Sequence, residues 1–187
     1  HTIHSMRRNI DMTYVVMDNH VYGLTKGQAS PRSDLGFQTV TSPEGTIENP
    51  ISAIGLALAS GATFIAQTTA RDIQGAAELI RQGMEHKGFA FINIFSPCVT
   101  YNPKNTYDWF AEHIKPLAEI EGYDPSNKMH ALDALEKYDG LMTGVIYQDT
   151  TQKDYQAKLT HSLATPLTEL SLELDKDVFE TWKKSYM

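Results

Sequence analysis

The chain has 187 residues, a formal net charge of −7 and a hydrophobic fraction of 41%. This length can enclose one α/β core, and no apolar run approaches the length of a membrane span. The negative charge argues against nucleic acid as a partner, because phosphate backbones are bound by basic surfaces. The composition therefore indicates a soluble globular protein for which neither nucleic acid nor a membrane is an expected partner.

Apolar runs alternate with amphipathic segments along the chain. The first run, residues 14–17, is continuous rather than alternating, which is typical of a strand buried on both faces of a parallel sheet. Asn49-Pro50 is expected to start a helix, because proline is favoured at the first helical position. The later expected elements are a strand at 63–67, a helix capped by Asp72 and ending near 85, a strand at 89–96, helices at 107–115 and 129–137, a strand at 143–147, and helices at 155–163 and 175–186.

This alternation predicts an α/β fold with a parallel sheet and helices on both of its faces. Residues 1–150 are expected to form one domain. Residues 151–187 differ in character and predict a mostly helical carboxyl-terminal extension. His86, His113, His130 and His161 are expected to be surface residues.

The segment 13–31 carries the clearest functional pattern. Its strand ends in Asp18-Asn19 and opens into a loop that contains Gly23 and Gly27. In open α/β sheets, ligands bind outside the carboxyl ends of the strands. The side-chain oxygen of Asn19 and a nearby carbonyl suit Mg²⁺, which fills its remaining positions with phosphate and water. An ordinary strand-to-loop turn is the alternative interpretation of the same residues.

Four motifs in order favour the ligand-binding interpretation: HTIHSMRRN at 1–9, DNHVYGLTKGQASP at 18–31, ENPISAIGLALASGATFIAQ at 48–67, and SPCVTYN at 96–102. Together they resemble the thiamine diphosphate-binding β subunits of 2-oxoacid:ferredoxin oxidoreductases. The resemblance implies the thiamine diphosphate-binding fold, also called the pyrophosphate module. The chain lacks the Gly-Asp-Gly segment and the CxxC pair of that family, so we expect it to be the carboxyl-terminal part of a longer subunit, with an incomplete domain at its amino-terminal side.

The resemblance assigns roles to residues of the loop. Asn19 and the carbonyl of Val21 are expected to bind magnesium, and Lys26 and Gln28 to line the substrate site. Lys26 would pair with a substrate carboxylate or an acyl-acceptor phosphate, although a solvated loop lysine is an equally simple interpretation. Arg32 stands where the family loop predicts a small hydroxyl residue. The full set of expected cofactor-binding residues is Asn19, Val21, Tyr22, Gly23, Leu24 and Thr25.

Cys98 is the only cysteine of the chain. A lone cysteine is usually a small buried hydrophobic residue. Cys98, however, follows the expected strand 89–96 at its carboxyl end. In the similar family this cysteine is one of four thiolates that bind a [4Fe–4S] cluster, and a single thiolate cannot hold a cluster. Low cysteine use agrees with a reducing cytoplasm.

The resemblance implies coenzyme A-dependent oxidative decarboxylation of a 2-oxoacid, with 2-oxoglutarate favoured over pyruvate. The implied cofactors are thiamine diphosphate, Mg²⁺ and a [4Fe–4S] cluster, and the implied partners are an α subunit, ferredoxin, coenzyme A and the 2-oxoacid. Two alternatives remain open. One is a non-redox thiamine diphosphate enzyme, either a 2-oxoacid decarboxylase or an acetolactate-synthase-like protein, which should not need Cys98; the other is a non-catalytic assembly subunit.

Overall fold

The computed structural model describes residues 1–159, 167–169 and 175–186. The chain divides into two units, His1–Gln156 and Ala157–Met187, and each is described by itself. Among the described residues, no helix has both the length and the apolar character that crossing a membrane requires.

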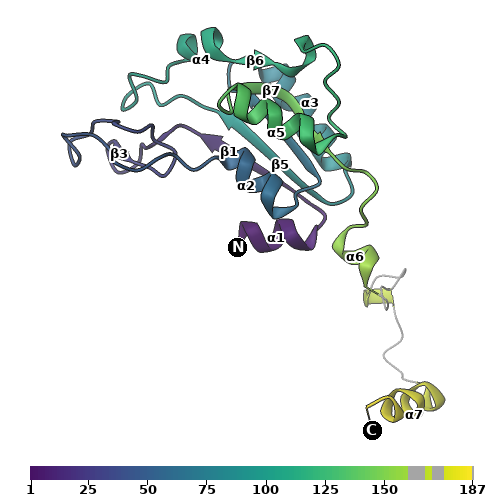
Figure 1. Cartoon of the computed structure of the whole chain (residues 1–187). Coiled ribbons are helices and arrows are strands. Elements are labelled where there is room, and N and C mark those ends of the chain that lie inside the picture. Colours follow the sequence, from purple (N-terminus) through teal and green to yellow (C-terminus); the bar gives the residue numbers. More distant parts are fainter. Residues whose placement is uncertain (160–166, 170–174, 187) are drawn as a thin grey trace. The chain divides into compact units, whose positions relative to one another are not determined.

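The first unit is built on a five-stranded sheet with the strand order β1-β5-β4-β7-β6 (Figure 1). Strands β1, β5 and β4 are parallel to one another, whereas β7 runs antiparallel to β4 and parallel to β6. The strands are β1 (Met12–Asp18), β4 (Phe64–Thr69), β5 (Phe89–Phe95), β6 (Lys115–Pro116) and β7 (Met142–Gln148).

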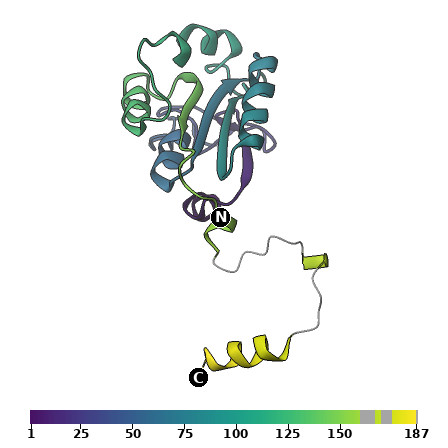
Figure 2. The same ribbon diagram turned by 90° about the vertical axis from the view of Figure 1, so that its right-hand side faces the viewer.

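Helices cover both faces of this sheet (Figure 2). Helices α1 (Thr2–Arg8), α2 (Ala53–Ser60) and α5 (Lys128–Lys137) pack on one face, around a core that contains Phe89, Phe91 and Ile65. Helix α3 (Ile73–Glu85) packs on the other face, where Leu79 meets Ala66 and Ile92. The expected α/β class is therefore confirmed, with β7 as the antiparallel strand. The connection from β5 to β6 contains α4 (Tyr107–His113), and η1 (Leu117–Glu119) follows β6.

The environment of β1 differs from the prediction. We expected this strand to be buried on both faces, yet 39% of Tyr14, 38% of Val15 and 59% of Met17 are exposed. The reason is position: in the described part of the chain β1 pairs with β5 alone and forms one edge of the sheet. The continuous apolar run correctly predicted a strand but not its coverage.

Helix α2 begins later than the proline predicted. It starts at Ala53, and Ser52 is the N-cap because its hydroxyl accepts a hydrogen bond from Gly55 N–H at 3.0 Å. Pro50 lies ahead of the helix. A serine cap satisfies a free N–H of the first turn, which a proline at that point cannot do. The cap predicted for α3 is confirmed, because Asp72 accepts from Gly75 N–H at 2.9 Å.

The later part of the chain is helical where it is described. Helix α6 (Tyr155–Lys158) is shorter than the expected helix 155–163, whose residues from 160 onward lie outside the described residues, as does His161. Within the first unit, the peptide N–H of Tyr155 donates to Asn9 O at 2.8 Å. The second unit contains η2 (Leu167–Glu169) and α7 (Lys176–Lys184).

Candidate functional site at the carboxyl end of the first strand

The loop between β1 and α2 leaves the carboxyl end of β1 and extends beyond the sheet (Figure 1). It begins with a tight turn, in which Oδ1 of Asn19 accepts a hydrogen bond from Val21 N–H at 3.1 Å. The chain then forms a short hairpin from β2 (Val21–Tyr22) and β3 (Gln28–Ala29). The predicted substrate residue Gln28 pairs with the predicted cofactor residue Tyr22 in this hairpin.

Three residues that the sequence predicted for cofactors converge at the start of the hairpin. A Cβ atom placed on Gly23 would lie 3.6 Å from Sγ of Cys98 and 3.7 Å from Nδ2 of Asn19. Cys98 comes from the loop after β5, which is distant from the hairpin in sequence. The structure thus brings the expected magnesium ligand and the expected cluster ligand to one place, and glycine leaves space between them.

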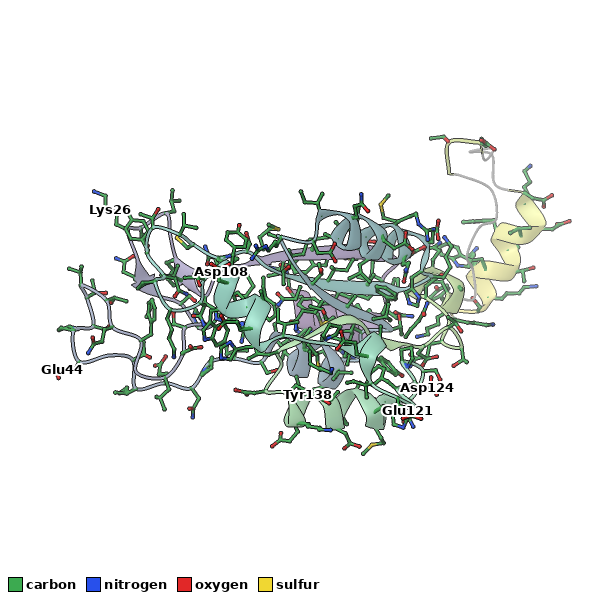
Figure 3. The ribbon with its side chains drawn as sticks, turned by 90° about the horizontal axis from the view of Figure 1, so that it is seen from above. Lys26, Glu44, Asp108, Glu121, Asp124 and Tyr138 are labelled. Atoms are coloured by element: carbon green, nitrogen blue, oxygen red, sulfur yellow. The ribbon has the colours of Figure 1, made fainter. Side chains whose placement is uncertain are left out.

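The tip of the hairpin turns back on itself. Gly27 N–H donates to Tyr22 O at 2.9 Å, and Lys26 and Gly27 have positive φ angles of 72° and 94°. A Cβ on Gly27 would lie 2.9 Å from Cδ1 of Tyr101, so the tyrosine ring packs directly on this glycine. Leu24 is 99% exposed. Lys26 projects away from the sheet at the outer end of the first unit (Figure 3).

Asn102 joins the loop after β5 to the turn at the end of β1. Its Nδ2 donates to the carbonyl of Asn19 at 3.4 Å and to Oδ1 of Asn105 at 3.0 Å. Asn102 and Asn105 are both 1% exposed. The backbone at Asn19 is therefore held by a buried amide from the segment that also carries Cys98.

A buried charged cluster on Asp18 fixes the same turn, and sequence reasoning missed it. Nε of Arg32 donates to Oδ2 of Asp18 at 2.8 Å, and Nη2 of Arg32 lies 3.2 Å from Nε2 of His20. Arg32 Nη1 also donates to the carbonyl of Ile51. The hydroxyl of Ser33 donates to His20 O at 2.6 Å. The only signal in the sequence was the presence of Arg32 where a small hydroxyl residue was expected.

The cluster sets the charge of Asp18. Burial would raise the pKa of this carboxyl group, but hydrogen bonding from His20 and the charge of Arg32 outweigh that effect and lower the pKa to about 2. Nε2 of His20 lies 3.2 Å from Nη2 of Arg32 and 3.5 Å from Oδ2 of Asp18, so it accepts from the guanidinium or donates to the carboxylate according to the tautomer of the ring. Nδ1 has no hydrogen-bond partner and lies 4.0 Å from Oδ1 of Asp34.

A cavity of about 690 Å³ opens beside this cluster. It is lined by Arg32 and His20 from the loop, by Ser52 at the start of α2, by Gln67 from β4 and by Lys104. The ammonium of Lys104 lies 2.8 Å from Asp34. Burial alone would raise the pKa of the Asp34 carboxyl group, but Lys104, Asn105 and His20 together lower it. Both cations on the cavity wall are thus already paired with carboxylates.

The donors present fit a magnesium diphosphate site in their chemistry. The Asn19 side chain and the Val21 carbonyl offer neutral oxygen atoms of the kind that magnesium binds together with phosphate and water. For a cluster, the described residues contain no group of three or more His, Cys, Asp or Glu side chains that could hold a metal ion. Cys98 is partly buried, has a free thiol and fits one corner of a four-thiolate site.

Comparison with known proteins defines the class. Residues 1–94 match the family described as "Thiamine pyrophosphate enzyme, C-terminal TPP binding domain", and residues 98–162 match the family of the C-terminal region of the pyruvate ferredoxin oxidoreductase beta subunit. The chain belongs to the thiamine pyrophosphate enzymes and, within them, groups with the β subunits of 2-oxoacid:ferredoxin oxidoreductases. The fold and the resemblance expected from the sequence are confirmed.

Two relatives of known description are similar to most of this chain. The chain is 37% identical over 169 residues to a 2-oxoacid:ferredoxin oxidoreductase subunit beta from Sulfolobus sp, a match that covers 85% of this chain and 55% of the relative. It is 39% identical over 147 residues to the 2-oxoglutarate synthase subunit KorB of Methanocaldococcus jannaschii, over 78% of this chain and 52% of the relative.

A solved structure agrees with these relatives. It is the 2-oxoglutarate:ferredoxin oxidoreductase from Magnetococcus marinus, described with 2-oxoglutarate, coenzyme A and succinyl-CoA bound. The match has a TM-score of 0.78 and 40% identity, and it covers 84% of this chain and 54% of that chain. The chain spans about half the length of the relatives that it matches.

Proposed function

We propose that this chain forms the thiamine diphosphate-binding part of a 2-oxoacid:ferredoxin oxidoreductase, which carries out coenzyme A-dependent oxidative decarboxylation of a 2-oxoacid. The observation that carries the proposal is the convergence of Asn19, Gly23 and Cys98, because a diphosphate-magnesium turn and a cluster cysteine then lie side by side. The similarity to β subunits of this enzyme class supports it. We favour 2-oxoglutarate as substrate because several relatives are named for it.

In this proposal, Asn19 and the Val21 carbonyl hold the magnesium ion of the cofactor. The peptide segment of Tyr22, Gly23, Leu24 and Thr25 lies along the cofactor. When bound, thiamine diphosphate supplies the carbanion and the electron sink that decarboxylation of a 2-oxoacid needs. This chain would bind the diphosphate end of the cofactor and so fix the orientation of the cofactor.

The tip of the hairpin is proposed to orient the substrate. Lys26 is exposed, and its side chain projects away from the sheet (Figure 3). It would attract the substrate carboxylate or a phosphate of coenzyme A as a point charge. Gln28 anchors the returning strand of the hairpin and contributes an amide to the same region.

Cys98 is proposed to contribute one thiolate to a [4Fe–4S] cluster, with the other three from residues outside this chain. The nearness of Cys98 to the cofactor turn would shorten the path of the electrons to ferredoxin. The same proposal includes a cytoplasmic location, because such thiolates need reducing surroundings. An α subunit would supply the general base and the remaining wall of the site.

The experiment uses the complete complex, purified without oxygen. We would measure reduction of ferredoxin or a low-potential dye that depends on both the 2-oxoacid and coenzyme A, with 2-oxoglutarate and pyruvate compared. Reduction with 2-oxoglutarate is expected. Carbon dioxide release without reduction would contradict the redox function and indicate a decarboxylase, and absence of thiamine diphosphate binding would leave an assembly subunit.

A variant pair sharpens this experiment. In Cys98→Ser the cluster signal and dye reduction are expected to disappear while the complex still binds thiamine diphosphate. In Asn19→Ala cofactor binding is expected to weaken while the cluster signal stays. Loss of both signals in each variant would mean that the two residues only support the fold.

A further inference from the structure

We propose that Arg32 is a positioning residue, which acts through Asp18 to fix the turn that presents Asn19 to the magnesium diphosphate. The inference rests on the proposed function, because it concerns the same cofactor site. Arg32 itself lies fourteen residues from Asp18 in sequence and is not expected to touch the cofactor.

The contacts of the guanidinium group carry this inference. Arg32 donates to the Asp18 carboxylate at 2.8 Å, faces the His20 ring at 3.2 Å, and donates to the carbonyl of Ile51. These partners belong to the end of β1, to the turn, and to the segment before α2. One side chain therefore joins the turn at residues 18–20 to the segment before α2, and a planar guanidinium is suited to such simultaneous contacts.

Asp18 transmits the effect of Arg32 to the turn. Its Oδ1 accepts from the peptide N–H of His20 at 3.3 Å while its Oδ2 is held by Arg32. Only 3% of the Asp18 side chain is exposed. Within the described ranges, Arg32 is the one arginine or lysine that forms an ion pair with Asp18. Asn19 thus lies between two residues that the Arg32 side chain contacts directly.

Removal of Arg32 would leave a buried carboxylate without its cation, next to the proposed magnesium ligand. A buried unpaired charge is costly, so the turn would rearrange to bring Asp18 to water or to another donor. An uncompensated carboxylate would also repel the diphosphate of the cofactor. Serine or threonine, the kind of residue that the family resemblance predicts at position 32, is too short to form the contacts of Arg32. The cofactor turn of this chain therefore depends on an ion pair that a small hydroxyl residue could not form.

The test measures cofactor affinity in the assembled complex of the full-length subunit. We would titrate thiamine diphosphate at fixed Mg²⁺ and determine its Kd for the wild type, Arg32→Met, Arg32→Lys and Arg81→Met. Arg81 is an exposed arginine of α3 that pairs with Glu78 and Glu85, so it is the matched control for loss of a paired arginine. Removal of a residue that orients a metal ligand typically costs about 10- to 100-fold in affinity.

The expected result is a rise in Kd of about this size for Arg32→Met, with the maximal rate at saturating cofactor close to that of the wild type. The Kd of Arg32→Lys should lie between those of the wild type and Arg32→Met, because an ammonium group cannot make the three contacts together. Arg81→Met should leave Kd unchanged. A lower melting temperature of Arg32→Met with an unchanged Kd would show a purely structural role and overturn the inference.

Asp18→Asn, alone and combined with Arg32→Met, tests whether Arg32 acts through Asp18. If Arg32 acts through Asp18, the double variant with Arg32→Met should lose no more affinity than either single variant, whereas independent roles would give additive losses and overturn the inference. Failure of the wild-type complex to bind thiamine diphosphate would overturn the proposed function itself. Normal binding in the wild type with equal binding in Arg32→Met would overturn this inference alone.

Discussion

Nε2 of His86 lies 2.7 Å from Oγ1 of Thr63, and both residues are buried. The Thr63 hydroxyl donates its single hydrogen to Oδ1 of Asn9 at 2.7 Å, so it accepts from His86. His86, expected on the surface, thus belongs to a buried hydrogen-bonded cluster that connects α1, β4 and the end of α3. The prediction of a surface residue was wrong because histidine is common in both environments.

This cluster predicts a dependence of stability on pH. Burial lowers the pKa of His86 below its usual value, although Asp11 and Asp149 partly oppose the effect. The unfolded chain therefore binds more protons than the folded chain below pH 6.5, and the free energy of unfolding falls as the pH decreases toward the folded pKa. The slope can reach at most about 1.4 kcal/mol per pH unit, the value for one whole proton. Chemical unfolding of the full-length protein between pH 5 and 8 measures it.

His86→Gln keeps a donor for Thr63 but removes the titration, so its stability should vary less with pH than that of the wild type. His4→Gln, a change at an exposed histidine, should retain the full dependence. If the free energy of unfolding changed equally with pH in the wild type and in His86→Gln, the titration of His86 would not be the cause of the pH dependence.

Gly27→Ala tests the packing of the hairpin tip. The new Cβ would meet the Tyr101 ring at 2.9 Å, and φ at this position is +94°. Gly36→Ala is the matched control, because φ there is +76° but nothing lies within 4 Å of the added atom. Backbone strain of about 1–3 kcal/mol is common to both variants. Only Gly27→Ala should also displace the hairpin, with faster proteolysis at Lys26 and weaker cofactor binding; equal proteolysis of the two variants would contradict this.

Gln67→Leu tests a buried amide in β4. Nε2 of Gln67 donates to the carbonyls of Gly140 and Met142, both at 2.7 Å, and Gln67 is 1% exposed. Leucine would leave these carbonyls without that donor, at a cost of about 1–3 kcal/mol for an unsatisfied buried group. A clear fall in melting temperature is expected, whereas Gln74→Leu, at an exposed position of α3, should change it little. Similar melting temperatures for the two variants would refute this role.

Lys26→Met tests the proposed attraction of the substrate. Loss of the charge should raise KM for the 2-oxoacid or for coenzyme A, according to which anion the ammonium binds, and leave kcat nearly unchanged. Lys87→Met removes an exposed lysine that pairs with Asp11 at a distance from the loop, and should alter neither constant. Unchanged KM values in Lys26→Met would support the interpretation of a solvated loop lysine.

The sequence predicted the features that depend on local pattern. Continuous apolar runs at β4 and β5 mark strands that are fully covered, and Asp72 marks the start of α3, because a capping side chain acts within a few residues. The Asp-Asn turn and Cys98 were predicted through a resemblance that extends over several motifs, and their roles as ligands stay predictions.

What the sequence could not predict depends on contacts between distant segments. The ion pair of Arg32 with Asp18 forms only after the loop has turned back, and the burial of His86 follows from the placement of Asn9 beside Thr63. The exposure of β1 likewise depends on which strands flank it rather than on its own residues. Each of these features depends on residues that are distant in sequence, and the local periodicity of the sequence carries no information about such contacts.

The open side of β1 affects how the protein can be handled. Its outer N–H and C=O groups and the exposed Tyr14, Val15 and Met17 form a ready template for another strand. Unprotected strand edges of this kind lead to edge-to-edge association and aggregation. Produced alone, residues 1–187 should precipitate or form oligomers through this edge, so biochemical work should begin from co-expression with the proposed partner chains.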